Sequence, residues 1–276
     1  MKVVRVMVAL GLWSVTLFPS LGKAATNFFQ ALEKSGTIVS KVYPPPAAPK
    51  ATRVRKNAAP AKGFVFIPGG TVRLGSPEGG ADAPVHVATV PGFWLARHET
   101  TRAEYTEFLN ATHATNAPSG FVRRGEKWQP HWFEGRLPVA NVMLDDAQNY
   151  CRWLNGKLGC HARLPSEDEW ETAARGDMVG ARYPWGWGDP AGRACFAVPA
   201  PRRVETFEPN PFGLYDMAGN VFEWCAPADA VVEKIVARGG SWAEHDPHLL
   251  RVFHRAWFRR DYRGADVGFR VLIEEK

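Results

Sequence analysis

The sequence predicts an α+β domain built from short strands, a few capped helices and long irregular segments. Glycine and tryptophan are abundant, with 26 and 11 of the 276 residues. This favours a loop-rich fold held by large aromatic side chains over a helical bundle. Hydrophobic residues make up 45% of the chain, enough for a sizeable core. Helix start signals occur at three places, and glycines and prolines interrupt the other apolar runs.

Each expected element has a local signal. An apolar strand over residues 64–67 ends at Pro68, and the next strand begins near Val72. Two helices begin with a capping box, in which a hydroxyl and an acid three residues later satisfy the first amides of the helix. A third helix follows an acidic cap and has apolar residues at i, i+3, i+4 and i+7. The cap residues are Thr101 with Glu104, Asp145, and Ser166 with Glu169.

The first 24 residues have the pattern of a secretory signal peptide. Lys2 and Arg5 precede an apolar run over residues 6–18, which is too short to span a bilayer. Gly22 and Ala24 offer small side chains at the cleavage site. The pattern predicts export to the periplasm and a mature protein that is not integral to the membrane. An uncleaved membrane anchor is the alternative.

Residues 25–62 combine a short apolar stretch with a basic linker. Phe28, Phe29 and Leu32 would lie on one side of a short helix over residues 25–40. Residues 43–62 are rich in proline, alanine and positive charge without apolar periodicity, which is typical of an extended linker. We therefore place the folded domain at residues 63–276.

The net charge of +6 belongs to the N-terminal segment and not to the folded domain. Residues 1–62 hold ten Lys and Arg and one Glu, which leaves 24 basic and 27 acidic residues, a net charge of −3, for residues 63–276. A nucleic-acid-binding domain is expected to be basic. We therefore expect no nucleic-acid partner.

A series of motifs runs in order across residues 64–272. They include residues 67–70 (IPGG), 74–76 (LGS), 99–101 (ETT), 163–171 (RLPSEDEWE), 183–186 (YPWG), 212–224 (FGLYDMAGNVFEW), 238–242 (RGGSW) and 268–270 (GFR). This series resembles the domain family of the formylglycine-generating enzyme, also called sulfatase-modifying factor. The resemblance implies that family's fold, an elaborated C-type-lectin-like domain with few regular elements. Trp170, Trp185, Trp224 and Trp242 would be core anchors whose indole N–H groups need partners.

The residues of the family's best-known chemistry are replaced. In the enzymes that give the family its name, two cysteines shortly after the Gly-Gly-Ser-aromatic motif bind copper and oxidise a sulfatase cysteine. Glu244 and Leu249 match those positions here. Neither side chain is a soft thiolate ligand for copper(I). We therefore expect no copper cofactor and no formylglycine-generating activity.

Polar residues follow the same motif. Glu244, His245, Asp246 and His248 lie within five residues. A His-x-x-His pair with flanking acids can bind a divalent metal, although an exposed loop can hold the same residues without one. Glu244, His245 and His248 are the candidate catalytic residues, as acid or base near a bound small molecule. In a protein without catalysis they would contact a partner instead.

The resemblance also implies a structural calcium ion. In the family, the stretch before the Glu-Trp pair surrounds calcium with side-chain and main-chain oxygens. The matching ligands are the side chains of Asp216 and Glu223 and the carbonyls of Gly219 and Val221. Carboxylates and carbonyls suit a hard cation. The alternative is that the two acids only cap backbone amides in a turn.

The four cysteines leave their pairing open. No C-x-x-C occurs, which argues against a zinc ribbon or a thioredoxin-type site. An oxidising compartment would allow one or two disulfides. Cys151 matches a family position that often holds a cysteine, but Val271 stands where its partner would be.

Three functions remain as hypotheses, and whether the chain is an enzyme stays open. The first is a periplasmic accessory or regulatory protein that binds a protein partner, such as a regulator of type VI secretion signalling. The second is a cysteine-independent periplasmic oxidase that matures a small molecule, such as the chromophore of a pyoverdine-type siderophore. The third is an accessory protein of denitrification. Each follows from the resemblance to family members that lack the cysteine pair.

Overall fold

The computed structural model describes residues 4–8, 38–42, 59–229 and 232–275. The chain divides into two units, Met1–Arg53 and Val54–Lys276. In the first, β1 (Val4–Val8) pairs antiparallel with β2 (Ile38–Val42). Strand β2 replaces the end of the expected helix over 25–40, because its β-branched residues favour a strand. The rest of that helix and most of the expected signal peptide lie outside the described residues.

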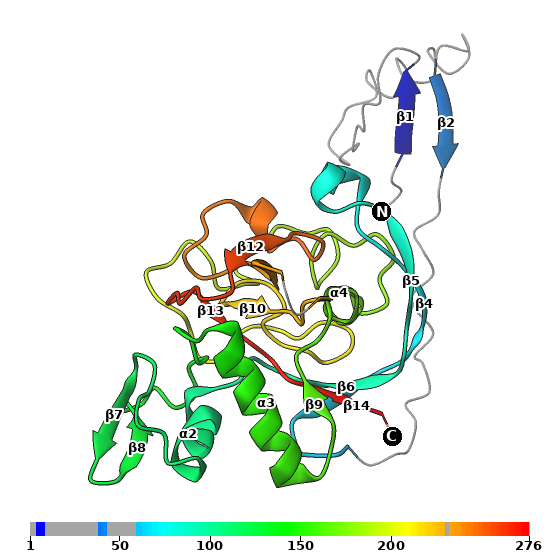
Figure 1. Ribbon diagram of the computed structural model, residues 1–276. Helices are drawn as coiled ribbons and strands as arrows, with labels where there is room; N and C mark the ends of the chain where they lie inside the picture. The colour runs from blue at the N-terminus through cyan, green and yellow to red at the C-terminus, as the bar shows by residue number, and fades with distance from the viewer. Residues whose placement is uncertain (1–3, 9–37, 43–58, 230–231, 276) are drawn as a thin grey trace. The chain divides into compact units, whose positions relative to one another are not determined.

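Two four-stranded sheets form the centre of the second unit (Figure 1). The first has the order β3 (Phe64–Ile67), β6 (Phe93–Ala96), β14 (Leu272–Glu274) and β9 (Ala162–Arg163). The second has the order β12 (Ala256–Arg259), β11 (Lys234–Arg238), β10 (Phe222–Trp224) and β13 (Val267–Gly268). Strand β14 lies inside the first sheet, so Leu272 and Ile273 are part of the core. The expected strands near residues 64 and 72 are confirmed.

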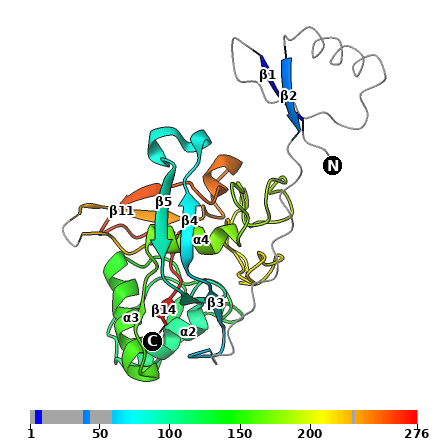
Figure 2. The same ribbon diagram turned by 90° about the vertical axis from the view of Figure 1, so that its right-hand side faces the viewer.

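Two antiparallel ribbons and two short 3-10 helices complete the strand-rich part. Ribbon β4 (Gly70–Leu74) and β5 (His86–Val90) runs beside helix α4 (Glu167–Arg175), as Figure 2 shows. Ribbon β7 (Phe121–Arg124) and β8 (Lys127–Pro130) packs against helix α2 (Arg102–Ala111). The 3-10 helices are η1 (Pro77–Asp82) and η2 (Pro247–Leu250). Apart from the α-helices, most of the other described residues are irregular, as the sequence predicted.

Three α-helices begin close to the predicted caps. Both capping boxes are present, at α2 (Arg102–Ala111) and at α4 (Glu167–Arg175). Helix α3 (Leu144–Leu158) has Met143 as its N-cap residue, and Asp146 accepts the Met143 N–H at 2.9 Å. The predicted cap, Asp145, therefore lies inside the first turn. No helix among the described residues is long and apolar enough to cross a membrane.

Two of the four predicted tryptophan anchors are fully buried. Trp170 donates its indole N–H to the Glu223 carboxylate at 2.6 Å, and Trp224 donates to the Val142 carbonyl at 2.9 Å. Trp185 and Trp242 are only half-buried. The core therefore surrounds the 216–224 segment, where the predicted ion site lies.

Candidate functional site

The segment after β11 bends as its glycines predict. Gly239 and Gly240 have φ angles of 96° and 77°, a region that favours glycine. A Cβ atom at Gly240 would lie 2.5 Å from Leu250 Cδ2, so packing also excludes a larger residue there. Ser241 is buried behind the bend. The chain then emerges at residues 242–249, where the family's enzymes carry their cysteine pair.

Backbone hydrogen bonds hold this loop against two neighbouring segments. The Trp242 N–H donates to the Asn220 carbonyl at 2.8 Å. The Val198 N–H donates to Trp242 O at 3.1 Å, and the Ala197 N–H donates to Glu244 O at 2.8 Å. The loop from Trp242 to Glu244 therefore has a fixed backbone.

The polar side chains of the loop face different surroundings. Glu244 is half-buried, and this burial, followed by the charge of Asp266, raises the pKa of its carboxyl. His245 and His248 are exposed. Asp246 caps η2 by accepting the His248 N–H at 2.9 Å, and its Oδ1 lies 3.7 Å from His248 Nδ1. In the described part of the chain, no three His, Cys, Asp or Glu side chains are grouped so as to hold a metal ion.

The predicted calcium ligands lie close together, but Glu223 is already engaged. Its carboxylate accepts bonds at 2.6 Å from Nε and Nη2 of Arg270, in addition to the Trp170 indole. All three side chains are fully buried. A carboxylate with both oxygens bound to a guanidinium does not fit as a calcium ligand in this arrangement. Asp216 accepts the Glu205 N–H at 2.8 Å and has a φ of 56°.

A further buried acid joins this group, and the sequence reasoning missed its role. Glu99 accepts the Asn220 side-chain amide at 2.6 Å and the Val221 N–H at 3.0 Å. The acidic side chain of Glu99 in the motif over residues 99–101 was the available signal. Nothing in the neighbouring residues predicted that it contacts residues about 120 positions away.

The group holds more negative than positive charge. The carboxyls of Glu99, Asp216 and Glu223 surround one guanidinium, that of Arg270. Burial, and then the charges of Asp216 and Glu223, raise the pKa of Glu99 well above its usual value. Burial raises the pKa of Asp216 to about 6. Glu99 and Asp216 therefore hold their protons more tightly than free carboxyls do, and a calcium ion at Asp216 stays a prediction.

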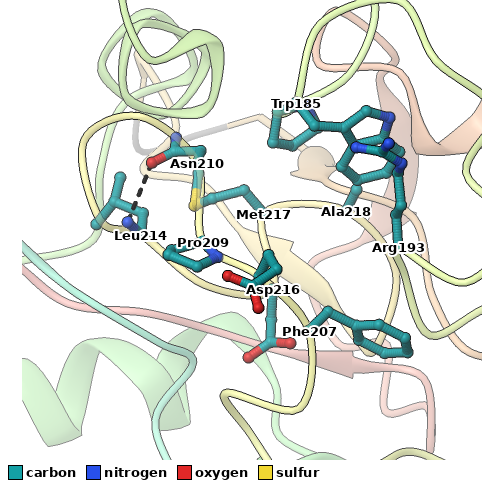
Figure 3. A pocket seen from close by; sticks show the side chains of 11 residues that line it. Trp185, Arg193, Phe207, Pro209, Asn210, Leu214, Asp216, Met217 and Ala218 are labelled. Carbon is teal, nitrogen blue, oxygen red and sulfur yellow. Dashed lines mark hydrogen bonds between the residues drawn. The ribbon is translucent and has the colours of Figure 1, made fainter.

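A small pocket opens beside Asp216 (Figure 3). Its volume is about 300 Å³, part of which is open to solvent. Trp185 and Arg193 lie on one side, and Asp216 and Phe207 on the other. The pocket therefore lies directly beside one of the predicted calcium ligands.

The cysteines provide no activated thiol. All four are buried, and none of them forms a disulfide in this structure. Burial raises the pKa of Cys151 to about 12 and of Cys195 to about 11, and it raises the pKa of Cys225 as well. Buried thiols of raised pKa are poor nucleophiles and poor metal ligands. The reaction of the cysteine pair therefore has no substitute thiols here.

Curated proteins and solved structures are similar to this chain. Serine/threonine-protein kinase pkn1 of Chlamydia pneumoniae is 36% identical over 75% of this chain, which spans 37% of that longer protein. The formylglycine-generating enzyme of Thermomonospora curvata is 31% identical, with 78% of this chain and 94% of the enzyme covered. The inactive C-alpha-formylglycine-generating enzyme 2 of Mus musculus is 29% identical, with 75% and 84% covered.

The structure of PvdO from Pseudomonas aeruginosa superposes with a TM-score of 0.66 at 28% identity, and covers 78% of this chain and 97% of that one. The CarF structure, at 22% identity and a TM-score of 0.59, shares the fold. The family profile of the sulfatase-modifying factor enzyme 1-like domain matches residues 50–275. The predicted α+β fold is confirmed, and because the profile matches most of the chain, the chain belongs to the sulfatase-modifying factor enzyme 1-like domain family.

Proposed function

We propose that this protein is a periplasmic accessory or regulatory protein that binds a protein partner through residues 242–248 and does not generate formylglycine. One observation carries the proposal. The bend that presents the cysteine pair in the family's enzymes is kept, while Glu244 and Leu249 occupy the positions of the thiols. A surface that keeps its backbone and loses its redox groups is suited to recognition.

The loop has the properties of a contact surface. Its backbone is fixed by the bonds at Trp242 and Glu244, so binding would order little additional chain. His245 and His248 are exposed on it beside two acids, and charged side chains at such a surface give orientation and specificity. Basic or amide-rich segments of a partner would complement these acids.

The relatives support a role without formylglycine chemistry. The Mus musculus relative is named as inactive. In pkn1 of Chlamydia pneumoniae, the matching region is about a third of a protein named as a serine/threonine kinase. A domain of this family joined to a signalling protein is consistent with regulation, and type VI secretion signalling is the regulatory context that we propose.

A second candidate is a cysteine-independent oxidase that matures a small molecule such as a siderophore chromophore. Glu244 favours it, because a half-buried carboxyl of raised pKa can exchange a proton with a bound substrate. The similarity to PvdO extends over nearly all of that chain. The two candidates differ in whether Glu244 acts on a proton or only makes a contact.

Site-specific crosslinking separates these candidates. Photoreactive benzoyl-phenylalanine is placed at His245 in the full chain and, as a control, at Val179, which is 75% exposed on another loop. We expect one protein to crosslink from position 245 only, and the purified partner to rebind. Glu244→Ala with His248→Ala should weaken that rebinding at least about tenfold, or about 1.4 kcal/mol.

Two results would contradict the binding proposal. Equal crosslinking from position 179 would show that the loop does not bind the partner specifically. Undiminished rebinding by the folded double variant would show that the interface lies elsewhere. Oxygen consumption with a small-molecule substrate, abolished by Glu244→Gln while partner binding persists, would support the oxidase instead.

A further inference from the structure

Two large aromatic side chains project from the turn that follows strand β8. Trp132 is 84% exposed and Phe133 is 73% exposed, more than most apolar residues of the domain. Their rings stack on one another, with centroids 5.1 Å apart and planes 8° from parallel. Aromatic side chains left in water at this exposure commonly mark an interaction site. We call this pair the aromatic wedge.

The turn holds the wedge outward. The Glu134 N–H donates to His131 O at 3.0 Å, and Phe133 has a φ of 66°. This left-handed conformation is unfavourable for a bulky residue, and it persists only where the surroundings impose it.

The start of helix α2 supplies those surroundings. The Ala103 N–H donates to the Gly135 carbonyl and the Arg102 N–H to the Leu137 carbonyl, both at 2.9 Å. Arg102 also forms an ion pair with Glu134. These bonds hold the turn that carries the wedge against the start of helix α2.

The adjoining ribbon carries positive charge. Arg123, Arg124 and Lys127 of β7–β8 are exposed, and Glu126 is the one acid among residues 121–130. The domain over residues 63–276 has a net charge of −3, so this ribbon is locally basic on an acidic protein. Figure 1 shows the ribbon at the edge of the domain beyond α2.

We propose that the aromatic wedge and the β7–β8 ribbon form a peripheral docking surface for a bilayer that contains anionic phospholipid. Tryptophan and phenylalanine partition into the interface between headgroups and acyl chains, and exposed basic residues are attracted to anionic headgroups. The rings stack face to face, so they form a wedge suited to insertion and not a flat platform suited to a sugar ring. This surface is separate from the 242–248 loop, so the proposal does not depend on the proposed function.

A probe at Trp132 itself tests the proposal in the full chain. Membrane binding by the N-terminal segment is then not mistaken for binding through this surface. The protein is labelled with 5-fluorotryptophan, and the Trp132 and Trp257 resonances are assigned with Trp132→Phe and Trp257→Phe. Trp257 is the matched control, because it is 54% exposed and lies on strand β12 of another part of the domain. Vesicles of phosphatidylcholine with about 30% phosphatidylglycerol carry a spin-labelled lipid, which broadens the signals of nearby fluorine nuclei.

We expect the Trp132 signal to broaden with these vesicles and the Trp257 signal to stay sharp. Pure phosphatidylcholine vesicles should broaden Trp132 at least about threefold less, because each basic residue near an anionic surface adds attraction. Arg124→Gln with Lys127→Gln should have a similar effect. A sharp Trp132 signal, or equal broadening of Trp257, would overturn the proposal.

Discussion

Replacing Asp216 by asparagine should stabilise the domain at neutral pH when no cation is bound. Asp216 shares its buried surroundings with Glu99 and Glu223, and burial raises its pKa from 3.8 to about 6. An acid whose pKa is higher in the folded state binds its proton more tightly there. Stability is therefore lost as the pH rises from about 4 to about 6, and the full cost remains at higher pH.

The magnitude follows from the difference in pKa. One pKa unit corresponds to about 1.4 kcal/mol, so ionised Asp216 costs the folded state roughly 3 kcal/mol above pH 6. Asparagine keeps an oxygen that can accept the Glu205 N–H, and it removes the charge. We expect Asp216→Asn to raise the free energy of unfolding by about 1–3 kcal/mol at pH 8, and by much less at pH 4.

Urea denaturation with a calcium chelator measures this effect, and the same series with calcium tests the predicted ion. Calcium at 100 times its dissociation constant would stabilise the wild-type protein by about 2.7 kcal/mol and should not stabilise the variant. A variant that is less stable than the wild type at pH 8 in chelator would refute the electrostatic reasoning. If calcium stabilises neither protein, a proton and not a calcium ion compensates the excess negative charge.

Three other substitutions test other contacts. The protein should bind no copper(I) in competition with a chelator, and stoichiometric binding lost on Glu244→Ala would contradict this. Asp168→Asn should destabilise the protein at pH 5 and progressively less above pH 7. The hydrogen bond to the Pro84 carbonyl, and then the pairing with Asp168 at 2.9 Å, raise the pKa of His86. The contribution from Asp168 is therefore present below pH 6.5 and lost as His86 deprotonates, and a pH-independent loss would contradict it. Arg270→Met should reduce stability by about 3–5 kcal/mol in urea denaturation, since it leaves the buried Glu223 charge without its partner, and a loss below about 1 kcal/mol would contradict it.

Local signals in the sequence located most elements of the fold but not the contacts of its charged core. Ser166 and Glu169 predicted the start of α4, because a capping box depends on residues three apart. The sequence predicts Asp145 as the cap of α3, whereas Met143 is the N-cap residue and Asp146 supplies the bond. Asparagine, aspartate, serine and threonine are the preferred cap residues. This preference does not reveal which acid accepts the N–H of the N-cap residue.

The candidate site shows the same limit. The bend at Gly239 and Gly240 could be predicted, since it depends on local backbone freedom. The partner of Glu223 could not, because Arg270 is 47 residues away and the choice between a cation and a guanidinium is made in three dimensions. The resemblance to the family implies the set of calcium ligands. Only the structure shows that the Arg270 guanidinium binds one of them, Glu223.

One residue connects the buried acids to the proposed contact loop. Asn220 donates its side-chain amide to Glu99, and its carbonyl accepts the Trp242 N–H that anchors the loop. Its side-chain oxygen accepts the Arg202 N–H, and its φ is 62°, so several contacts fix its position. Glu99 holds the amide of Asn220 in either protonation state, but more strongly when ionised. Asn220 therefore links the charge of Glu99 to the backbone bond that holds the contact loop.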